Sequence, residues 1–116
     1  MEARAVARYV RVSPKKARQV VDLVRGKRVG DALNILHFSP KGAAKPVEKA
    51  IRSAVANALN REGGSQVDAE ELTLQEIYVD GGLMMKRYRI AARSAIHRIR
   101  KRTSHITVIV SDEDGA

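Results

Sequence analysis

The chain has 116 residues, and 22 Lys and Arg against 13 Asp and Glu give it a net charge of +9. Its length suits a single domain, and hydrophobic residues at 44% suffice for one core, which must be aliphatic because aromatic residues make up only 3%. Cysteine is missing, which excludes disulfides and thiolate metal sites, and no apolar run approaches the roughly 20 residues of a membrane span. We therefore expect a cytosolic protein whose partner is a polyanion, either nucleic acid or an anionic membrane.

The positive charge is segregated along the chain. Residues 1–30 hold nine Lys and Arg and two acids, and residues 81–111 hold eight Lys and Arg and no acid. The stretch 31–80 has five Lys and Arg against eight acids, and residues 112–116 add three acids. A surface that served only solubility would mix the two signs. The two basic stretches are therefore candidate binding surfaces.

The chain opens with a predicted strand over residues 2–12, where small or aromatic side chains alternate with arginines such as Arg4 and Arg8. This period of two is typical of a half-buried strand with a basic outer face. The side chains expected to point inward are Ala3, Ala5, Ala7 and Tyr9.

A first helix is predicted from Ser13 and Pro14, because serine suits the N-cap position and proline the first helical position. Gly26 is placed to end this helix. Three cations crowd its first turns, where they oppose the helix dipole and where nearby phosphate oxygens would offset the cost. These cations are Lys15, Lys16 and Arg18.

Two more helices follow. A short one is predicted over residues 31–38, and Ser39 and Pro40 are expected to open a longer one. Because proline breaks a helix interior, the regular part starts near Pro46 or an irregular first turn precedes it. Gly63 and Gly64 are expected to end it.

Further strands are predicted over residues 71–80 and 104–111, with a basic segment between them. That segment is too long for an ordinary turn and has no continuous apolar stripe. Two interpretations remain, an extended β-hairpin or a basic surface helix, and the strands on both sides favour the hairpin. Its cations are mostly arginine, which suits bidentate contacts with phosphate.

Nothing in the sequence predicts an enzyme. The histidines, His37, His97 and His105, are not spaced as metal ligands, and no glycine-rich phosphate loop is present. The acids of the 71–80 strand have no base or nucleophile to pair with. We expect no catalytic residue, no cofactor and no metal.

Four runs of sequence resemble, in order, the universal large-subunit ribosomal protein twenty-two family. They are SPKKARQVVDLVRGK at 13–27, IRSAVANAL at 51–59, YVDGG at 78–82 and KRTSHITVIVSD at 101–112. The resemblance implies an α+β fold, with three helices packed on a small three-stranded antiparallel sheet and a long basic β-hairpin protruding. It also implies a single domain over residues 1–116, with the hairpin extension at about 82–102 and a short acidic tail at 112–116.

The same resemblance implies a structural constituent of the large ribosomal subunit. Such a protein binds large-subunit ribosomal RNA, assists subunit assembly, and reaches the wall of the nascent-peptide exit tunnel with its hairpin. Its partners would be that RNA, neighbouring large-subunit proteins and the nascent peptide, in the cytoplasm, with neither a membrane nor a homo-oligomer expected. Carried over by position, the RNA contacts would be Arg8, Arg11, Lys15, Lys16, Arg18, Arg25, Lys27, Lys86, Arg87, Arg89, Arg93, Arg98, Arg100, Lys101, Arg102, Ser104 and His105.

The tip of the expected hairpin departs from the family pattern. Ile90, Ala91, Ser94 and Ala95 stand where proline, arginine and glycine are common, so the tip is small and less basic. The residues expected to reach the tunnel are Arg89, Ile90, Ala91, Ala92 and Arg93.

Two other functions fit the size and the charge. A nucleoid-type DNA-binding protein with basic β-arms is one, although such arms usually carry a proline wedge and residues 82–102 contain no proline. A cationic membrane-surface protein is the other, but it would need an amphipathic helix with bulky anchors, and the chain has no Trp.

Overall fold

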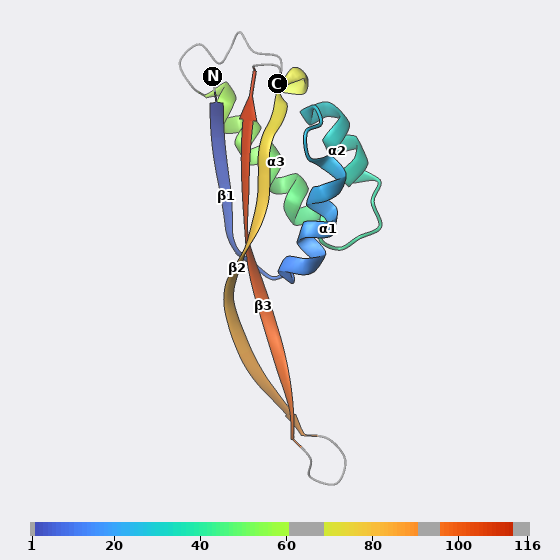
Figure 1. The fold of residues 1–116 in the computed structure, drawn as a ribbon, viewed down its shortest axis with the longest axis vertical. Coiled ribbons are helices and arrows are strands. Elements are labelled where there is room, and N and C mark those ends of the chain that lie inside the picture. The colour runs from blue at the N-terminus through green and yellow to red at the C-terminus, as the bar shows by residue number, and fades with distance from the viewer. Residues whose placement is uncertain (1, 61–68, 91–95, 113–116) are drawn as a thin grey trace.

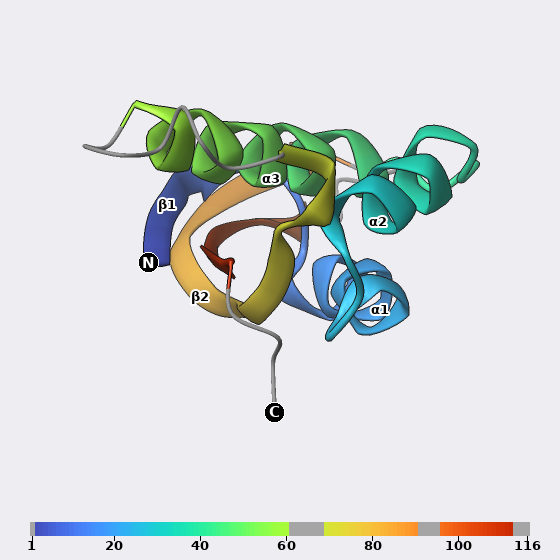
Figure 2. The same ribbon diagram turned by 90° about the horizontal axis from the view of Figure 1, so that it is seen from above.

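The computed structural model describes residues 2–60, 69–90 and 96–112. The strands form one antiparallel sheet in the order β1-β3-β2. Helix α3 lies along β1 and β3, while α1 lies beside β2 (Figures 1 and 2). The predicted α+β fold is confirmed. The elements are β1 (Glu2–Val10), α1 (Pro14–Val24), α2 (Val29–His37), α3 (Ala44–Leu59), the 3-10 turn η2 (Ala69–Glu71), β2 (Thr73–Ile90) and β3 (Ile96–Ser111).

Strand β1 follows the predicted alternation only as far as Ala7. Ala3 and Ala5 are buried against α3, but Tyr9 is 62% exposed, so its predicted inward position is wrong. The reason is a break in the ladder, because the register with β3 shifts between Ala7 and Val10 and Tyr9 has a φ of 55°. This irregularity also ends the strand two residues earlier than predicted.

Helix α1 begins and ends as its sequence predicts. The Ser13 hydroxyl accepts a hydrogen bond from the Lys16 N–H at 3.3 Å, and Pro14 is the first helical residue. Past the other end, Gly26 has a φ of 79°, the left-handed conformation that glycine adopts without strain. The buried face consists of Ala17, Val20, Val21 and Val24.

The third helix starts close to Pro46, as one of the two predicted alternatives has it, but it ends earlier than predicted. Ser39 and Pro40 do not open it, because the Ser39 hydroxyl accepts from the Lys41 N–H in a local turn and the helix starts at Ala44. Pro46 is its third residue, where a helix needs no N–H donor. The helix ends at Leu59, so it stops before Gly63 and Gly64, which lie outside the described residues.

The core is aliphatic, as the composition predicts. Every buried hydrophobic residue in the described part of the chain is Ala, Val, Leu or Ile. The largest are fully or almost fully buried and come from the helices, the sheet and the segment before β2. They are Leu36, Ile51, Leu72, Leu74, Ile77 and Ile106.

Strands β2 and β3 continue beyond this core as a two-stranded ribbon. Their pairing runs from Thr73 opposite Ser111 to Ile90 opposite Ile96. The molecule is therefore elongated, with extents of 64 × 26 × 21 Å (Figure 1). The hairpin interpretation is confirmed and the surface-helix interpretation is wrong for the described residues. We call residues 82–90 and 96–102 the ribbon, and the other described residues the body.

Candidate nucleic-acid interface

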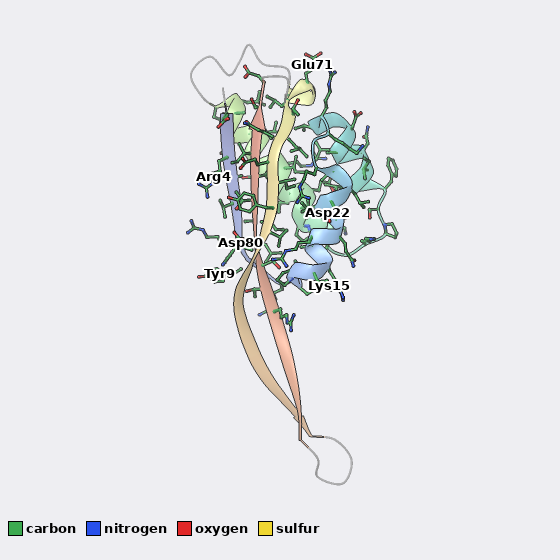
Figure 3. All side chains as sticks on the ribbon, viewed as in Figure 1. Arg4, Tyr9, Lys15, Asp22, Glu71 and Asp80 are labelled. Atoms are coloured by element: carbon green, nitrogen blue, oxygen red, sulfur yellow. The ribbon has the colours of Figure 1, made fainter. Side chains whose placement is uncertain are left out.

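The cations at the start of α1 lie at the end of the body from which the ribbon leaves. Lys15 and Lys16 are exposed in the first turn of the helix. Figure 3 shows Lys15 beside the root of the ribbon, with Tyr9 on the opposite side of that root. Arg8 and Arg11 are also exposed, on and just after β1. A partner that binds the ribbon could therefore contact these cations as well.

Two of the predicted RNA contacts, Arg18 and Arg25, form hydrogen bonds with backbone carbonyls of β2. Nε and Nη2 of Arg18 donate to the Val79 carbonyl at 3.3 and 3.1 Å, and Nη2 of Arg25 donates to the Ile77 carbonyl at 3.1 Å. Arg25 also forms an ion pair with Asp22 at 2.5 Å. Residues seven apart on a helix share one face, so both guanidinium groups reach the outer edge of β2.

The chain before α2 covers the same edge of β2. The Val29 N–H donates to the Leu72 carbonyl at 2.7 Å, and the Leu74 N–H donates to the Lys27 carbonyl at 3.0 Å. The backbone of Lys27 is thus fixed, while the residue as a whole remains exposed. Sequence reasoning missed this structural use of basic residues, because a charge pattern does not show which carbonyls a guanidinium will meet.

Ser104 and His105 form hydrogen bonds at the junction of the ribbon and the body. We call this junction, formed by Tyr9, Gly82 and residues 103–105, the neck. Ser104 is fully buried and its hydroxyl donates to the Val12 carbonyl at 2.6 Å. Nδ1 of His105 accepts from the Tyr9 N–H at 3.1 Å, and the two rings meet edge to face with centroids 4.8 Å apart. Ser104 therefore has a partner inside the protein, and His105 helps to hold Tyr9 in its left-handed conformation.

Gly82 completes the neck. A Cβ at this position would lie 2.5 Å from Oγ1 of Thr103 and 3.2 Å from Nε2 of His105, so the two strands meet there with no room for a side chain. The β2 register also shifts between Gly81 and Met84. The ribbon thus begins at an irregular and tightly packed step of the ladder.

Both strands of the ribbon contain cations. Lys86 lies directly opposite Arg100, and Tyr88 lies opposite Arg98. The cations of the ribbon are Lys86, Arg87 and Arg89 on β2 and Arg98, Arg100, Lys101 and Arg102 on β3.

Like charges directly opposite each other destabilise a strand pair. The ribbon also contains no acid, so it has no internal counter-charge. Ile90 belongs to the last described pair of the ribbon, and the predicted tip residues Ala91, Ala92 and Arg93 lie outside the described residues.

Neither a membrane span nor a metal site is found in the part of the chain that the structure describes. No helix there is both long enough and apolar enough to cross a bilayer. No group of three or more His, Asp or Glu there is placed to hold a metal ion.

A small aliphatic body that projects a cationic ribbon without acids is the form expected of a protein that binds a polyanion. Comparison with known proteins gives the particular family. Residues 5–111 match the family described as Ribosomal protein L22p/L17e. The chain belongs to this family, whose members are structural constituents of the large ribosomal subunit and not enzymes.

Similar proteins span almost the whole chain. "Large ribosomal subunit protein uL22" of Desulfitobacterium hafniense is 55% identical over 112 residues, covering 97% of this chain and 96% of that protein. The protein of the same name from Halothermothrix orenii is 55% identical over 113 residues, and that of Bifidobacterium longum is 49% identical over 118 residues. These two alignments cover 97% and 100% of this chain, and 97% and 99% of the two relatives. The nucleoid-protein alternative gains no support from these comparisons.

Proposed function

We propose that this chain binds large-subunit ribosomal RNA through its ribbon and the adjoining end of the body. In this proposal it assists assembly of the subunit, and its ribbon reaches the wall of the nascent-peptide exit tunnel. One copy is bound per large subunit in the cytoplasm, next to other large-subunit proteins, and no homo-oligomer forms.

The observation that supports RNA binding most strongly is the cross-strand register of the ribbon. Lys86 pairs in register with Arg100, in a part of the ladder that lies beyond the last described pair of β1 with β3, Val10 with Ser104. An isolated two-stranded ribbon is only marginally stable in water, and opposed like charges weaken it further. Phosphate groups on both faces would neutralise these charges, and the release of their counterions would favour binding.

The proposed contact set follows the exposure of the body residues and the register of the ribbon. Ser104 is left out because it is buried, and Arg18 and Arg25 act first on the edge of β2. His105 lies at the neck, where its ring is partly exposed beside the contacting residues. The proposed phosphate contacts are Arg8, Arg11, Lys15, Lys16, Lys27, Lys86, Arg87, Arg89, Arg93, Arg98, Arg100, Lys101 and Arg102.

A charge-neutralising variant of the ribbon tests this proposal. We expect Lys86→Gln, Arg98→Gln and Arg100→Gln together to weaken binding to a large-subunit ribosomal RNA fragment. Each lost phosphate contact should flatten the slope of log K against log salt by about 0.7 to 0.9. Lys41→Gln, Lys45→Gln and Lys49→Gln remove the same charge at and before the start of α3 and should leave the slope unchanged. Equal losses in the two variants would contradict a specific ribbon interface.

The tunnel part of the proposal needs a separate test. The uncharged residues Ile90, Ala91 and Ala92 would suit a wall past which peptides slide, with Arg89 and Arg93 anchoring them to RNA on either side. A photo-cross-linking side chain at position 91 should label a nascent chain stalled on the ribosome. The same group at Tyr78, on the body, should not label it. Labelling only from position 78 would rule out the tunnel position.

A further inference from the structure

A groove lies between the outer edge of β1 and helix α3. Its volume is about 530 Å³, and its lining includes Ala5, Ala7, Pro46 and Ala50 together with Lys45 and Lys49. The lining is thus small and apolar at the base and cationic along the helix. Arg8 also lines the groove and is one of the proposed phosphate contacts, but none of those contacts belongs to α3, so Lys45 and Lys49 are not explained by that function.

The edge of β1 beside this groove offers free backbone groups. β1 pairs only with β3 and so forms one edge of the described sheet. Nδ2 of Asn57 donates to the Arg4 carbonyl at 2.9 Å from outside the ladder. In an antiparallel pair alternate residues turn their N–H and C=O groups away from the partner, so the backbone groups of Val6 face outward like those of Arg4. The Tyr9 N–H bonds His105 on β3, so the Arg8 carbonyl in the same peptide unit points away from β3 as well. Within the described residues, no hydrogen bond from beyond the sheet reaches the backbone of Val6 or Arg8.

Helix α3 runs antiparallel to this edge, and the spacing of its lysines matches the spacing of alternate residues in a strand. Asn57 meets β1 at Arg4, while Lys45 and Lys49 line the groove beside Ala7 and Arg8. Lys49 follows Lys45 by one helical turn, a rise of about 6 Å. Two residues of an extended strand span about 6.6 Å. If a further strand paired with β1, two of its side chains that are two residues apart would therefore have the same spacing as Lys45 and Lys49, and each could contact one of these lysines.

We propose that the β1 edge and α3 bind an extended acidic segment of a partner protein, which adds to the sheet as a fourth strand. The outward groups of Val6 and Arg8 bond its backbone, and carboxylates at alternate positions meet Lys45 and Lys49. The exposed edge supplies carbonyl acceptors as well as N–H donors, which suits a peptide backbone and disfavours a phosphate chain, because phosphate groups only accept. The inference goes beyond RNA binding and does not depend on it.

The test uses the full-length chain and a synthetic eight-residue peptide in which Glu alternates with Val. Binding is followed by calorimetry and by amide hydrogen exchange. We expect the peptide to slow exchange at the Val6 and Arg8 amides. Lys45→Glu with Lys49→Glu should weaken binding by about tenfold or more, and a peptide with Lys in place of Glu should regain affinity for this variant. Lys15→Glu with Lys16→Glu gives the same change in net charge at α1 and should leave peptide binding unchanged.

Two outcomes would overturn the inference. One is an equal loss of affinity in the α1 control variant, and the other is unchanged exchange at Val6 and Arg8 when the peptide is bound. A photo-cross-linker at Ser53, also in the groove, extends the test to intact large subunits. Adducts with an acid-rich protein segment support the inference, whereas adducts with RNA alone contradict it. Peptide binding is measured without RNA, so its failure leaves the ribbon proposal intact.

Discussion

The body and the ribbon contain two halves of the same two strands, yet their backbones are supported differently. In the body, β3 lies between β1 and β2 under α3, and Ile106, Val108 and Val110 are fully buried. In the ribbon, β3 continues with β2 as its sole partner among the described elements, and Lys86 pairs in register with Arg100. One half of the ladder is stabilised by apolar burial, and the other half contains cations and no acid.

Hydrogen exchange should reveal this difference as the largest expected effect. Amides in a cooperatively folded core exchange only on global unfolding, so the Val108 amide should exchange about a thousandfold or more slowly than the Lys86 amide in the free protein. Ribosomal RNA should slow exchange across residues 84–90 and 96–100 and leave the body unchanged. Strong protection of the ribbon without RNA would show that it is stable by itself and would remove the distinction.

A pair of isoleucines on β3 tests the same difference by stability. Ile106→Ala should lower the free energy of unfolding by about 2 to 5 kcal/mol, because Ile106 is fully buried and its loss leaves a cavity. Ile99→Ala, in the ribbon, should change it by less than about 0.5 kcal/mol. Urea denaturation followed by circular dichroism measures both values. Similar losses at the two positions would mean that the ribbon contributes to the core.

Substitutions of two neighbouring glycines, Gly81 and Gly82, test how closely β2 and β3 pack where the ribbon meets the body. Gly82→Ala should cost about 1 to 3 kcal/mol, because its Cβ would meet Thr103 at 2.5 Å and force the strands apart. Gly81→Ala should cost much less, since the nearest atom to its Cβ is Cγ of Pro14 at 4.0 Å. Thermal unfolding of the two variants gives the comparison, and equal stability would contradict the close contact at Gly82.

The smallest expected effects separate structural from RNA-binding cations on α1. Arg18→Met should lower stability by about 1 kcal/mol through loss of its hydrogen bonds to Val79, with little change in the salt slope of RNA binding. Lys15→Gln with Lys16→Gln should do the reverse, leaving stability within about 0.5 kcal/mol and flattening the slope by about 0.7 to 0.9 per contact. If Arg18→Met also flattens the slope, this guanidinium contacts phosphate in addition to the sheet.

Local signals in the sequence predicted much of the fold. Ser13 and Pro14 begin α1 because their capping chemistry is local, and the alternation of Ala3 with Ala5 indicates a strand whatever lies beside it. The predicted end of α3 is wrong because Gly63 and Gly64 are only a breaking signal, and the helix ends earlier, at Leu59 with Asn60 as its C-cap. Tyr9 was misplaced because a register shift depends on the partner strand.

The candidate site was predictable in composition but not in detail. The charge segregation identified the ribbon and the start of α1. All four of these residues are exposed, and the charge pattern could not separate Arg18 and Arg25, whose guanidinium groups bond β2 carbonyls, from Lys15 and Lys16, for which no such bond is found among the described residues. It also could not show that Ser104 is buried, because serine occurs in both environments. These distinctions depend on which segments meet in three dimensions.

The close packing at Gly82 has a mechanical consequence for the whole protein. A ribbon arm of nine residues reaches about 30 Å at 3.3 Å per residue, so the neck is the pivot of a long lever. A tilt of about 10° at this pivot would move the far end by about 5 Å, more than the spacing between adjacent strands. The close approach of Thr103 to Gly82 and the hydrogen bond between Tyr9 and His105 therefore determine the direction in which the ribbon projects. Small substitutions at these residues should change the position of its distant end.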